Sequence, residues 1–191
     1  AAMTWEKVTV LAGGVGAARM LSGIVSVVAP SAVTAIVNVG DDLELHGLHI
    51  SPDLDTITYT LAGEINPETG WGLRGESWQA MDTVRRYGGV SWFGLGDRDL
   101  GTHLYRTHRL DEGATLSEVT AEITAAWDLE VRLLPVTDET GVIGVVGLSA
   151  DLARQRAAPV LSSRQAGHGL CEVVARRPAQ PRLGLGRVDG V

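Results

Sequence analysis

Several residue types are scarce in this chain of 191 residues, and each scarcity excludes a class of protein. The single cysteine, Cys171, cannot form an internal disulfide, and no Cys and His residues have the spacing of a zinc site, which favours a reducing compartment. Basic side chains number 16 against 23 acidic ones, and the net charge is -7. We therefore expect neither nucleic acid nor an anionic membrane surface as a partner.

Long hydrophobic runs are also missing. The longest uncharged stretch, residues 20–40, is interrupted by Pro30 and diluted by Gly, Ser, Thr and Asn, so it fits a helix, a turn and a buried strand better than a membrane span. The N-terminal residues lack a signal-peptide pattern, because Glu6 and Lys7 precede only a short apolar stretch. The 45% of hydrophobic residues then predicts a globular, cytoplasmic protein.

Aromatic residues are absent from the C-terminal part of the chain, since all nine lie at or before Trp127. Residues 1–140 carry 9 basic and 20 acidic side chains, whereas residues 141–191 carry 7 basic and 3 acidic ones. The last segment therefore lacks the large side chains that anchor a core. We divide the chain into residues 1–138, with the composition of a folded domain, and a divergent tail, residues 139–191.

Strand and helix patterns alternate through the first part. Apolar runs predict strands at residues 7–12, 33–39, 90–95 and 131–136, and helical spacing predicts helices at residues 14–28, 52–62, 78–87 and 115–127. The β-α-β order at the start favours parallel strands joined by a right-handed crossover. The expected fold is α/β, a Rossmann-like parallel sheet flanked by helices and incomplete on its C-terminal side.

A glycine loop joins the first predicted strand to the first helix. Gly13, Gly14 and Gly16 lie where backbone amides and the helix dipole favour a phosphate group. Arg19 occupies the position of the third glycine in a dinucleotide fingerprint, where a guanidinium could bind phosphate. A tight turn with close helix-sheet packing is the alternative explanation for these glycines.

Four carboxylates follow the second strand closely. Asp41 and Asp42 end that strand, and Asp53 and Asp55 open the next helix, a pattern that predicts a Mg²⁺ site beside a phosphate. Adjacent residues of an extended segment point apart, as do helix positions about 200° apart, so we expect only part of this set to share one ion. An ordinary turn is the alternative explanation for Asp41 and Asp42. For Asp53 the alternative is a favourable interaction with the dipole at the helix start.

A polar cluster spans residues 96–103, after the predicted strand that contains Trp92. Asp97 and Asp99 could hold Arg98 or contact a ligand, and His103 could transfer a proton. A solvated loop with weak ion pairs is the alternative. The other histidines, His46, His49 and His108, show no metal-ligand spacing and are assigned no chemistry.

These segments together closely resemble the 2-phospho-L-lactate transferase family, whose actinobacterial members are phosphoenolpyruvate transferases of coenzyme F(420) biosynthesis. The resemblance runs without a break from about residue 7 to residue 138. The motifs that carry it lie at residues 8–19, 37–42, 46–56, 66–72 and 95–103.

The resemblance implies an enzyme that moves a phosphoenolpyruvyl or 2-phospholactyl group from a guanosine diphosphate-linked three-carbon acid to the deazaflavin Fo, and releases GMP. It implies Mg²⁺ as the cofactor, with Asp42 and Asp55 as metal ligands and catalytic residues. The substrate-binding residues that it implies are Gly13, Gly14, Gly16, Asp55, Gly94, Asp97 and Arg98. A homodimer is the assembly that the family suggests.

The resemblance ends after Asp138, and we expect a chain truncated or frame-shifted relative to a longer family. Two other functions therefore stay open. One is a non-catalytic module that binds a nucleotide or nucleotide sugar, and the other is an inactive fragment of the transferase. The segment Ser51-Pro52-Asp53-Leu54-Asp55 favours the transferase.

Overall fold

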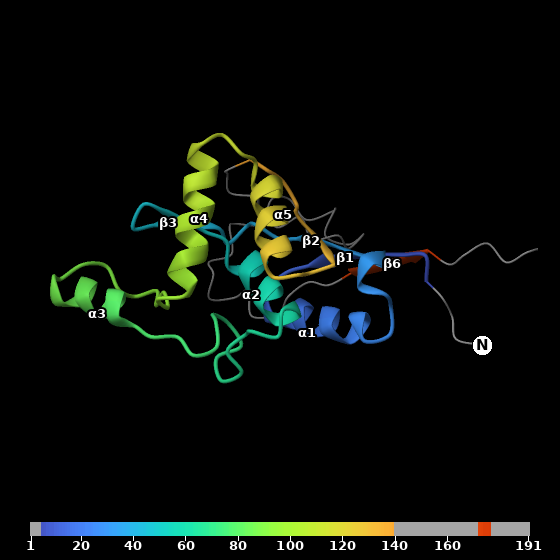
Figure 1. The fold of residues 1–191 in the computed structure, drawn as a ribbon, viewed down its shortest axis with the longest axis horizontal. Helices are drawn as coiled ribbons and strands as arrows, with labels where there is room; N and C mark the ends of the chain where they lie inside the picture. The colour runs from blue at the N-terminus through green and yellow to red at the C-terminus, as the bar shows by residue number, and fades with distance from the viewer. Residues whose placement is uncertain (1–4, 140–171, 177–191) are drawn as a thin grey trace, which may run out of the picture.

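The computed structural model describes residues 5–139 and 172–176. Its central sheet has the strand order β5-β2-β1-β6 (Figure 1). The strands β1 (Lys7–Ala12), β2 (Val33–Val37) and β5 (Arg132–Pro135) are parallel, whereas β6 (Glu172–Arg176) runs antiparallel to β1. The predicted α/β class with a parallel sheet is confirmed, and so are three of the four predicted strands. The rest of the predicted tail lies outside the described residues.

The helices next to the sheet match their predictions. They are α1 (Gly14–Val25), α2 (Pro52–Leu61) and α5 (Leu116–Ala126), and a short 3-10 turn, η1 (Pro30–Ala32), precedes β2. Since β1, β2 and β5 follow one another across the sheet, right-handed crossovers place α1 and α5 on the same face. The main core between them includes Val10, Leu21 and Ile57, all with 0% exposure.

A second group of elements lies at the other end of the molecule (Figure 1). The hairpin β3 (Leu43–Leu45) and β4 (Leu48–Ile50) follows β2, and α4 (Asp99–Asp111) packs against β4. The helix α3 (Gln79–Arg86) extends beyond them. Ile50, Met81 and Leu95 form a small separate core there. In the described part of the chain, no helix is long and apolar enough to cross a membrane.

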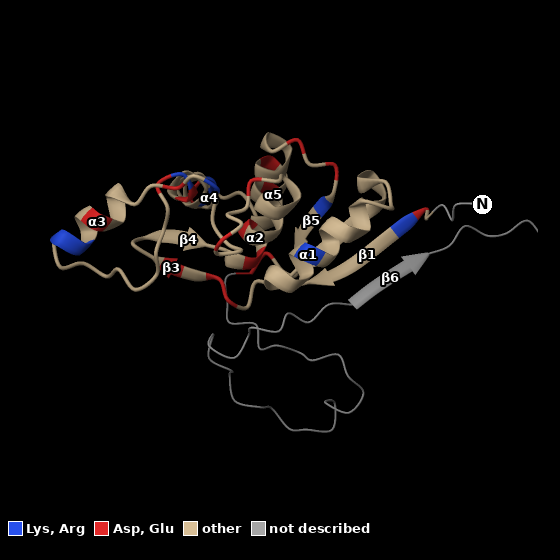
Figure 2. Cartoon of the chain, turned by 90° about the horizontal axis from the view of Figure 1, so that it is seen from below, with Lys and Arg blue, Asp and Glu red and all other residues tan. Residues whose placement is uncertain are grey.

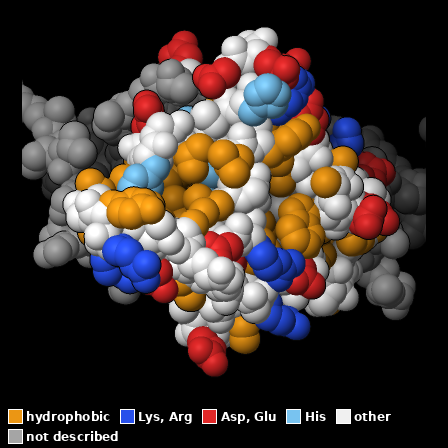
Figure 3. Space-filling view, turned by 60° about the vertical axis from the view of Figure 1, so that its left-hand side comes forward, with side chains coloured by type: hydrophobic (Ala, Val, Ile, Leu, Met, Phe, Trp, Pro, Cys, Tyr) orange, Lys and Arg blue, Asp and Glu red, His pale blue; other side chains and the backbone are white. Residues whose placement is uncertain are grey.

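Two sequence predictions are wrong in this region. Residues 90–95 form no strand, and Trp92 is 73% exposed, stacked edge-on against Phe93 at 5.5 Å between ring centroids. The cluster at residues 96–103 is not a loop throughout, because α4 begins at Asp99. Hydrophobic side chains instead gather on the surface at this end of the molecule (Figure 3). The apolar run therefore forms no strand: Trp92 is exposed, whereas Leu95 is buried in the small core with Ile50 and Met81.

Candidate functional site

The glycine loop leads from β1 into α1 as predicted. Gly13 is the extended N-cap residue, and Gly14 has a φ of 67°, which a side chain would strain. A Cβ on Gly13 would lie 3.1 Å from Asp53 Oδ2, whereas one on Gly16 would meet nothing within 4 Å. A side chain at position 13 would therefore crowd the Asp53 carboxylate, which glycine allows to approach the loop closely.

Two of the four predicted carboxylates, those of Asp41 and Asp53, share one hydrogen-bond donor. The side-chain nitrogen Nδ2 of Asn38 donates to Asp53 Oδ2 at 3.0 Å and to Asp41 Oδ1 at 3.3 Å. It thereby connects the segment after β2 with the start of α2. Figure 2 shows acidic segments around the place where α1, α2 and the hairpin approach one another. Asn38, Asp41, Asp42 and Asp53 are called the outer acidic group below.

Asp42 turns away from Asp41, as expected for adjacent residues. Its Oδ2 accepts from the hydroxyl of Ser51 at 2.7 Å and from Nε2 of His49 at 3.2 Å. Its Oδ1 is buried and has no hydrogen-bond partner among the described residues. A buried carboxylate oxygen without a donor is unfavourable, so this atom is suited to a cation.

The electrostatics of the outer acidic group also fit a cation. Burial, followed by repulsion from Asp53 and Asp42, raises the pKa of Asp41 to about 7. Burial raises the pKa of Asp53 as well, although its hydrogen bonds with Asn38 and the Gly14 amide oppose that rise. Crowded carboxylates beside exposed backbone amides match the oxygen ligands that Mg²⁺ takes together with a phosphate.

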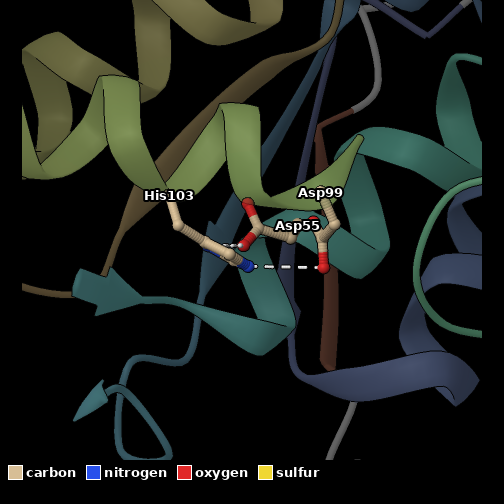
Figure 4. A group of neighbouring side chains, drawn as sticks. All are labelled: Asp55, Asp99 and His103. Carbon is tan, nitrogen blue, oxygen red and sulfur yellow. Dashed lines mark ion pairs between the residues drawn. The ribbon is translucent and has the colours of Figure 1, made fainter. Parts of the chain in front are cut away.

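Asp55 points the other way on α2, into the interior, in agreement with the expected separation from Asp53. Its carboxylate forms a bidentate ion pair with the guanidinium of Arg106, in which Nη1 donates to Oδ2 at 3.1 Å. His103 lies between Asp55 and Asp99, with Nε2 3.3 Å from Asp99 Oδ2 (Figure 4). These four side chains, all under 9% exposed, are called the inner group.

Within the inner group, the pKa values of Asp55 and Asp99 are shifted in opposite directions. Burial raises the pKa of Asp55, and the charge of Arg106 opposes that rise. Burial acts on Asp99 too, but its close contact with the ring of His103, the hydroxyl of Tyr59 and the charge of Arg106 lower its pKa overall. Tyr59 reaches Asp99 Oδ1 at 2.7 Å.

By spacing alone, Asp55, Asp99 and His103 could hold a metal ion, since one ligand atom of each lies within 4.8 Å of the others. The guanidinium of Arg106 also donates to Nδ1 of His103 at 3.3 Å. A permanent positive charge that contacts two of the three groups disfavours a second cation there. The acidic residues of the outer group do not lie at this spacing, but the group offers the unpartnered oxygen of Asp42 to a cation, with no arginine bound to that carboxylate among the described residues.

The other predicted substrate contacts lie apart from these two groups. Asp97 accepts from Ser77 and from the amides of Gln79 and Ala80, so it caps the start of α3, and these bonds lower its pKa. A Cβ on Gly94 would lie 3.2 Å from the ring of Trp78. Arg98 donates to the carbonyl of Arg74 and lines a groove of about 560 Å³ beside Tyr105 and Trp127. Their binding roles remain predictions.

Sequence reasoning missed Arg106, His49 and Tyr59. A signal for the first was present, because Asp99, His103 and Arg106 follow one another at helical spacing of four and three residues. A helix with such a polar stripe buries it only when each charge finds a partner. His49 and Tyr59 gave no comparable signal, because their partners lie on other elements.

Known proteins resemble this chain over most of its length. Residues 8–155 match the family described as 2-phospho-L-lactate transferase CofD. A phosphoenolpyruvate transferase of Mycobacterium avium (strain 104) is 44% identical over 171 residues, which cover 79% of this chain and 51% of that protein. One from Nocardia farcinica (strain IFM 10152) is 50% identical over 137 residues, which cover 71% and 41%. The chain thus spans about half the length of the curated relatives it matches.

Among solved structures, a protein of the UPF0052 family from Bacillus halodurans has a TM-score of 0.46 and 20% sequence identity. The comparison covers 72% of this chain and 41% of that chain.

Proposed function

Because this chain belongs to the 2-phospho-L-lactate transferase CofD family, we propose that it carries the metal and acceptor half of a transferase site. The proposed reaction moves a phosphoenolpyruvyl or 2-phospholactyl group from a guanosine diphosphate-linked donor to the deazaflavin Fo, in coenzyme F(420) biosynthesis. A hydroxyl oxygen of Fo forms the new bond to phosphorus, and the bond to the departing GMP breaks. The name of the relatives, phosphoenolpyruvate transferase, favours the phosphoenolpyruvyl group.

The observation that carries this proposal is the unpartnered, buried Oδ1 of Asp42, whose carboxylate lies close enough to Asp41 to help raise the pKa of that residue. Mg²⁺ held there would neutralise charge on the donor phosphates. Asp55 as the second ligand stays a prediction from the sequence; because Arg106 binds its carboxylate, the metal site proposed here depends on Asp42. The charge of Asp55 also contributes to the raised pKa of Asp41, so the two acidic groups are electrostatically coupled.

The residues of this chain then have distinct tasks. The amides of Gly13, Gly14 and Gly16 at the start of α1 bind a phosphate of the donor. Asp41 receives the proton of the Fo hydroxyl, since a carboxylate with a pKa of about 7 is well matched to a general base near neutral pH. No covalent intermediate is required for displacement at phosphorus.

Metal binding by the whole 191-residue chain tests the proposal directly. Mn²⁺, which is visible by electron paramagnetic resonance, is titrated at pH 8 into the wild type, Asp42→Asn and the control Asp128→Asn. Asp128 is exposed and lies in the turn between α5 and β5. We expect Asp42→Asn to bind Mn²⁺ at least about 10-fold more weakly, because a ligand is lost, and the control to bind normally. Equal affinity in all three proteins would exclude Asp42 as a ligand.

Acceptor binding is the second test. Fo is titrated into the same chain with and without Mg²⁺, and its fluorescence is followed. Tighter Fo binding with Mg²⁺ is the expected result. Binding of a guanine nucleotide with no measurable binding of Fo would instead favour the non-catalytic module.

A further inference from the structure

Helix α4 connects the outer acidic group with the inner group. It carries Asp99, His103 and Arg106 of the inner group, and it packs against β4. Arg106 of α4 binds Asp55 on α2, and the next residue, Thr107, binds the strand β4. Residues of two other segments, α2 and β4, are thus fixed by two consecutive side chains of α4. Helix α4 is therefore placed to set the position of both groups at once.

Arg106 is 1% exposed. Its Nε has no hydrogen-bond partner among the described residues, and its two terminal nitrogens donate to three different acceptors. These are the carboxylate of Asp55, Nδ1 of His103 at 3.3 Å and the backbone carbonyl of His49 at 3.3 Å. Burying an arginine is costly unless its charge is matched and its donors are used. A planar fork with fixed donor directions holds Asp55 in one orientation, which a lysine would not do.

His49 continues the connection to Asp42. Its carbonyl accepts from Arg106, its amide donates to Thr107 Oγ1 at 2.8 Å, and its ring Nε2 lies 3.2 Å from Asp42 Oδ2. The backbone of His49 is thus held on both sides by α4, while its imidazole holds Asp42. The charge of Asp42 in turn helps to raise the pKa of Arg106, which shows that the two ends of this path lie within electrostatic range.

We propose that Arg106 is a positioning residue of the transferase site, which orients Asp55 directly and Asp42 through His49. The inference rests on the proposed function. Arg106 is not itself a proposed ligand; it holds the backbone of His49, whose imidazole fixes the orientation of the Asp42 carboxylate. Partners of this kind, one step removed from the ligands, commonly change metal affinity by 10–100-fold when they are replaced.

Three variants of the full chain test this role. Arg106→Lys keeps the charge and loses the fork. Thr107→Val removes the hydroxyl that accepts from the amide of His49 and donates to the carbonyl of His103 within α4. The double variant Asp55→Asn with Arg106→Gln removes both buried charges together, so it folds even if an unpaired Asp55 would not. Arg109→Gln is the matched control, because Arg109 lies one turn away on α4 and pairs with the surface residue Glu122.

Two measurements are made on each variant, and both are interpreted only where the melting curve shows a folded protein. Mn²⁺ affinity should fall about 10-fold or more in Thr107→Val, Arg106→Lys and the double variant, and should be unchanged in Arg109→Gln. Hydrogen exchange of the amides at residues 43–50 should be faster in Thr107→Val and Arg106→Lys than in the control. A merely structural role would lower the melting temperature without changing the Mn²⁺ affinity of the folded protein.

Unchanged Mn²⁺ affinity in folded Thr107→Val and Arg106→Lys would overturn the positioning role. If the wild type itself bound no Mn²⁺, the proposed function would fail instead. In that case hydrogen exchange decides separately: faster exchange at residues 43–50 supports the link from α4 to the hairpin, and unchanged exchange refutes it.

Discussion

Asp41 shows how a single side chain couples pH to stability in this protein. Its pKa is raised from 3.8 to about 7, first by burial and then by Asp53 and Asp42, so its charged form is disfavoured by folding. The unfolded chain therefore loses this proton at lower pH than the folded one. The resulting penalty is absent below about pH 4, grows as the pH rises, and is complete above about pH 7.

We expect Asp41→Asn to be more stable than the wild type at pH 8, by about 1–2 kcal/mol after allowance for solvent screening. At pH 4 the two proteins should have the same stability, because the wild-type carboxyl is then protonated. Chemical denaturation at both pH values measures the difference. Asp128→Asn, at an exposed position, should show no pH-dependent gain. A gain for Asp41→Asn that is equal at pH 4 and pH 8 would contradict this account.

Tyr59 illustrates a buried hydroxyl whose loss affects the inner group. It is 0% exposed, donates to Asp99 Oδ1 at 2.7 Å and accepts from Thr102 Oγ1 at 2.7 Å. Tyr59→Phe removes the hydroxyl, and Asp99 and Thr102 then lose a buried hydrogen-bond partner. The free energy of unfolding should therefore fall by about 2 kcal/mol. Urea denaturation gives this value, and Tyr87→Phe, at 81% exposure, is the control that should change nothing. Equal stability of the two variants would show that water replaces the hydroxyl.

Helix α5 begins with side-chain hydrogen bonds to its first backbone amides. The hydroxyl of Thr115 accepts from the amide of Glu118 at 3.2 Å, and the Glu118 carboxylate accepts from the amide of Thr115 at 2.8 Å. This confirms the predicted capping box. The chain continues from α5 into β5, which pairs with β2.

Thr115→Ala should lower the free energy of unfolding by about 1 kcal/mol, because an amide at the helix start loses its acceptor. Thermal melting should shift down by a few degrees. Glu118→Gln is the matched control, since glutamine can keep its half of the box. If both variants melted at the same temperature, the threonine hydroxyl would contribute nothing.

The elements that sequence patterns misassigned share one physical cause. Residues 90–95 have the composition of a strand, but a strand needs the backbone of a neighbour, and this segment lies with α3 away from the central sheet. Helix α4 was missed because its buried face carries Asp99, His103 and Arg106 instead of apolar side chains. Local patterns report burial only where the buried residues are apolar.

For the whole molecule, the described part of the tail matters because β6 pairs with β1 along five residue pairs, from Lys7 with Arg176 to Leu11 with Glu172. This pairing covers the backbone groups on one side of β1. An uncovered strand at a sheet edge invites pairing with another chain.

Ending the chain after residue 139 should therefore lower its melting temperature and increase aggregation, measured by light scattering. A chain that ends after residue 176 keeps β6 and serves as the control, with expected behaviour close to that of the whole chain. The same melting temperature and scattering for the chains ending at 139 and 176 would refute a stabilising role for β6.

The sequence by itself determined the order of strand, glycine loop and helix, the acidic residues that follow β2, and the family to which the chain belongs. These features depend on local spacing, which backbone geometry converts directly into structure. Only the tertiary structure decided that Asp55 pairs with Arg106, 51 residues away, and that His49 holds Asp42. The choice among distant partners depends on how α4 packs against β4, and burial then requires each charge to find a complement.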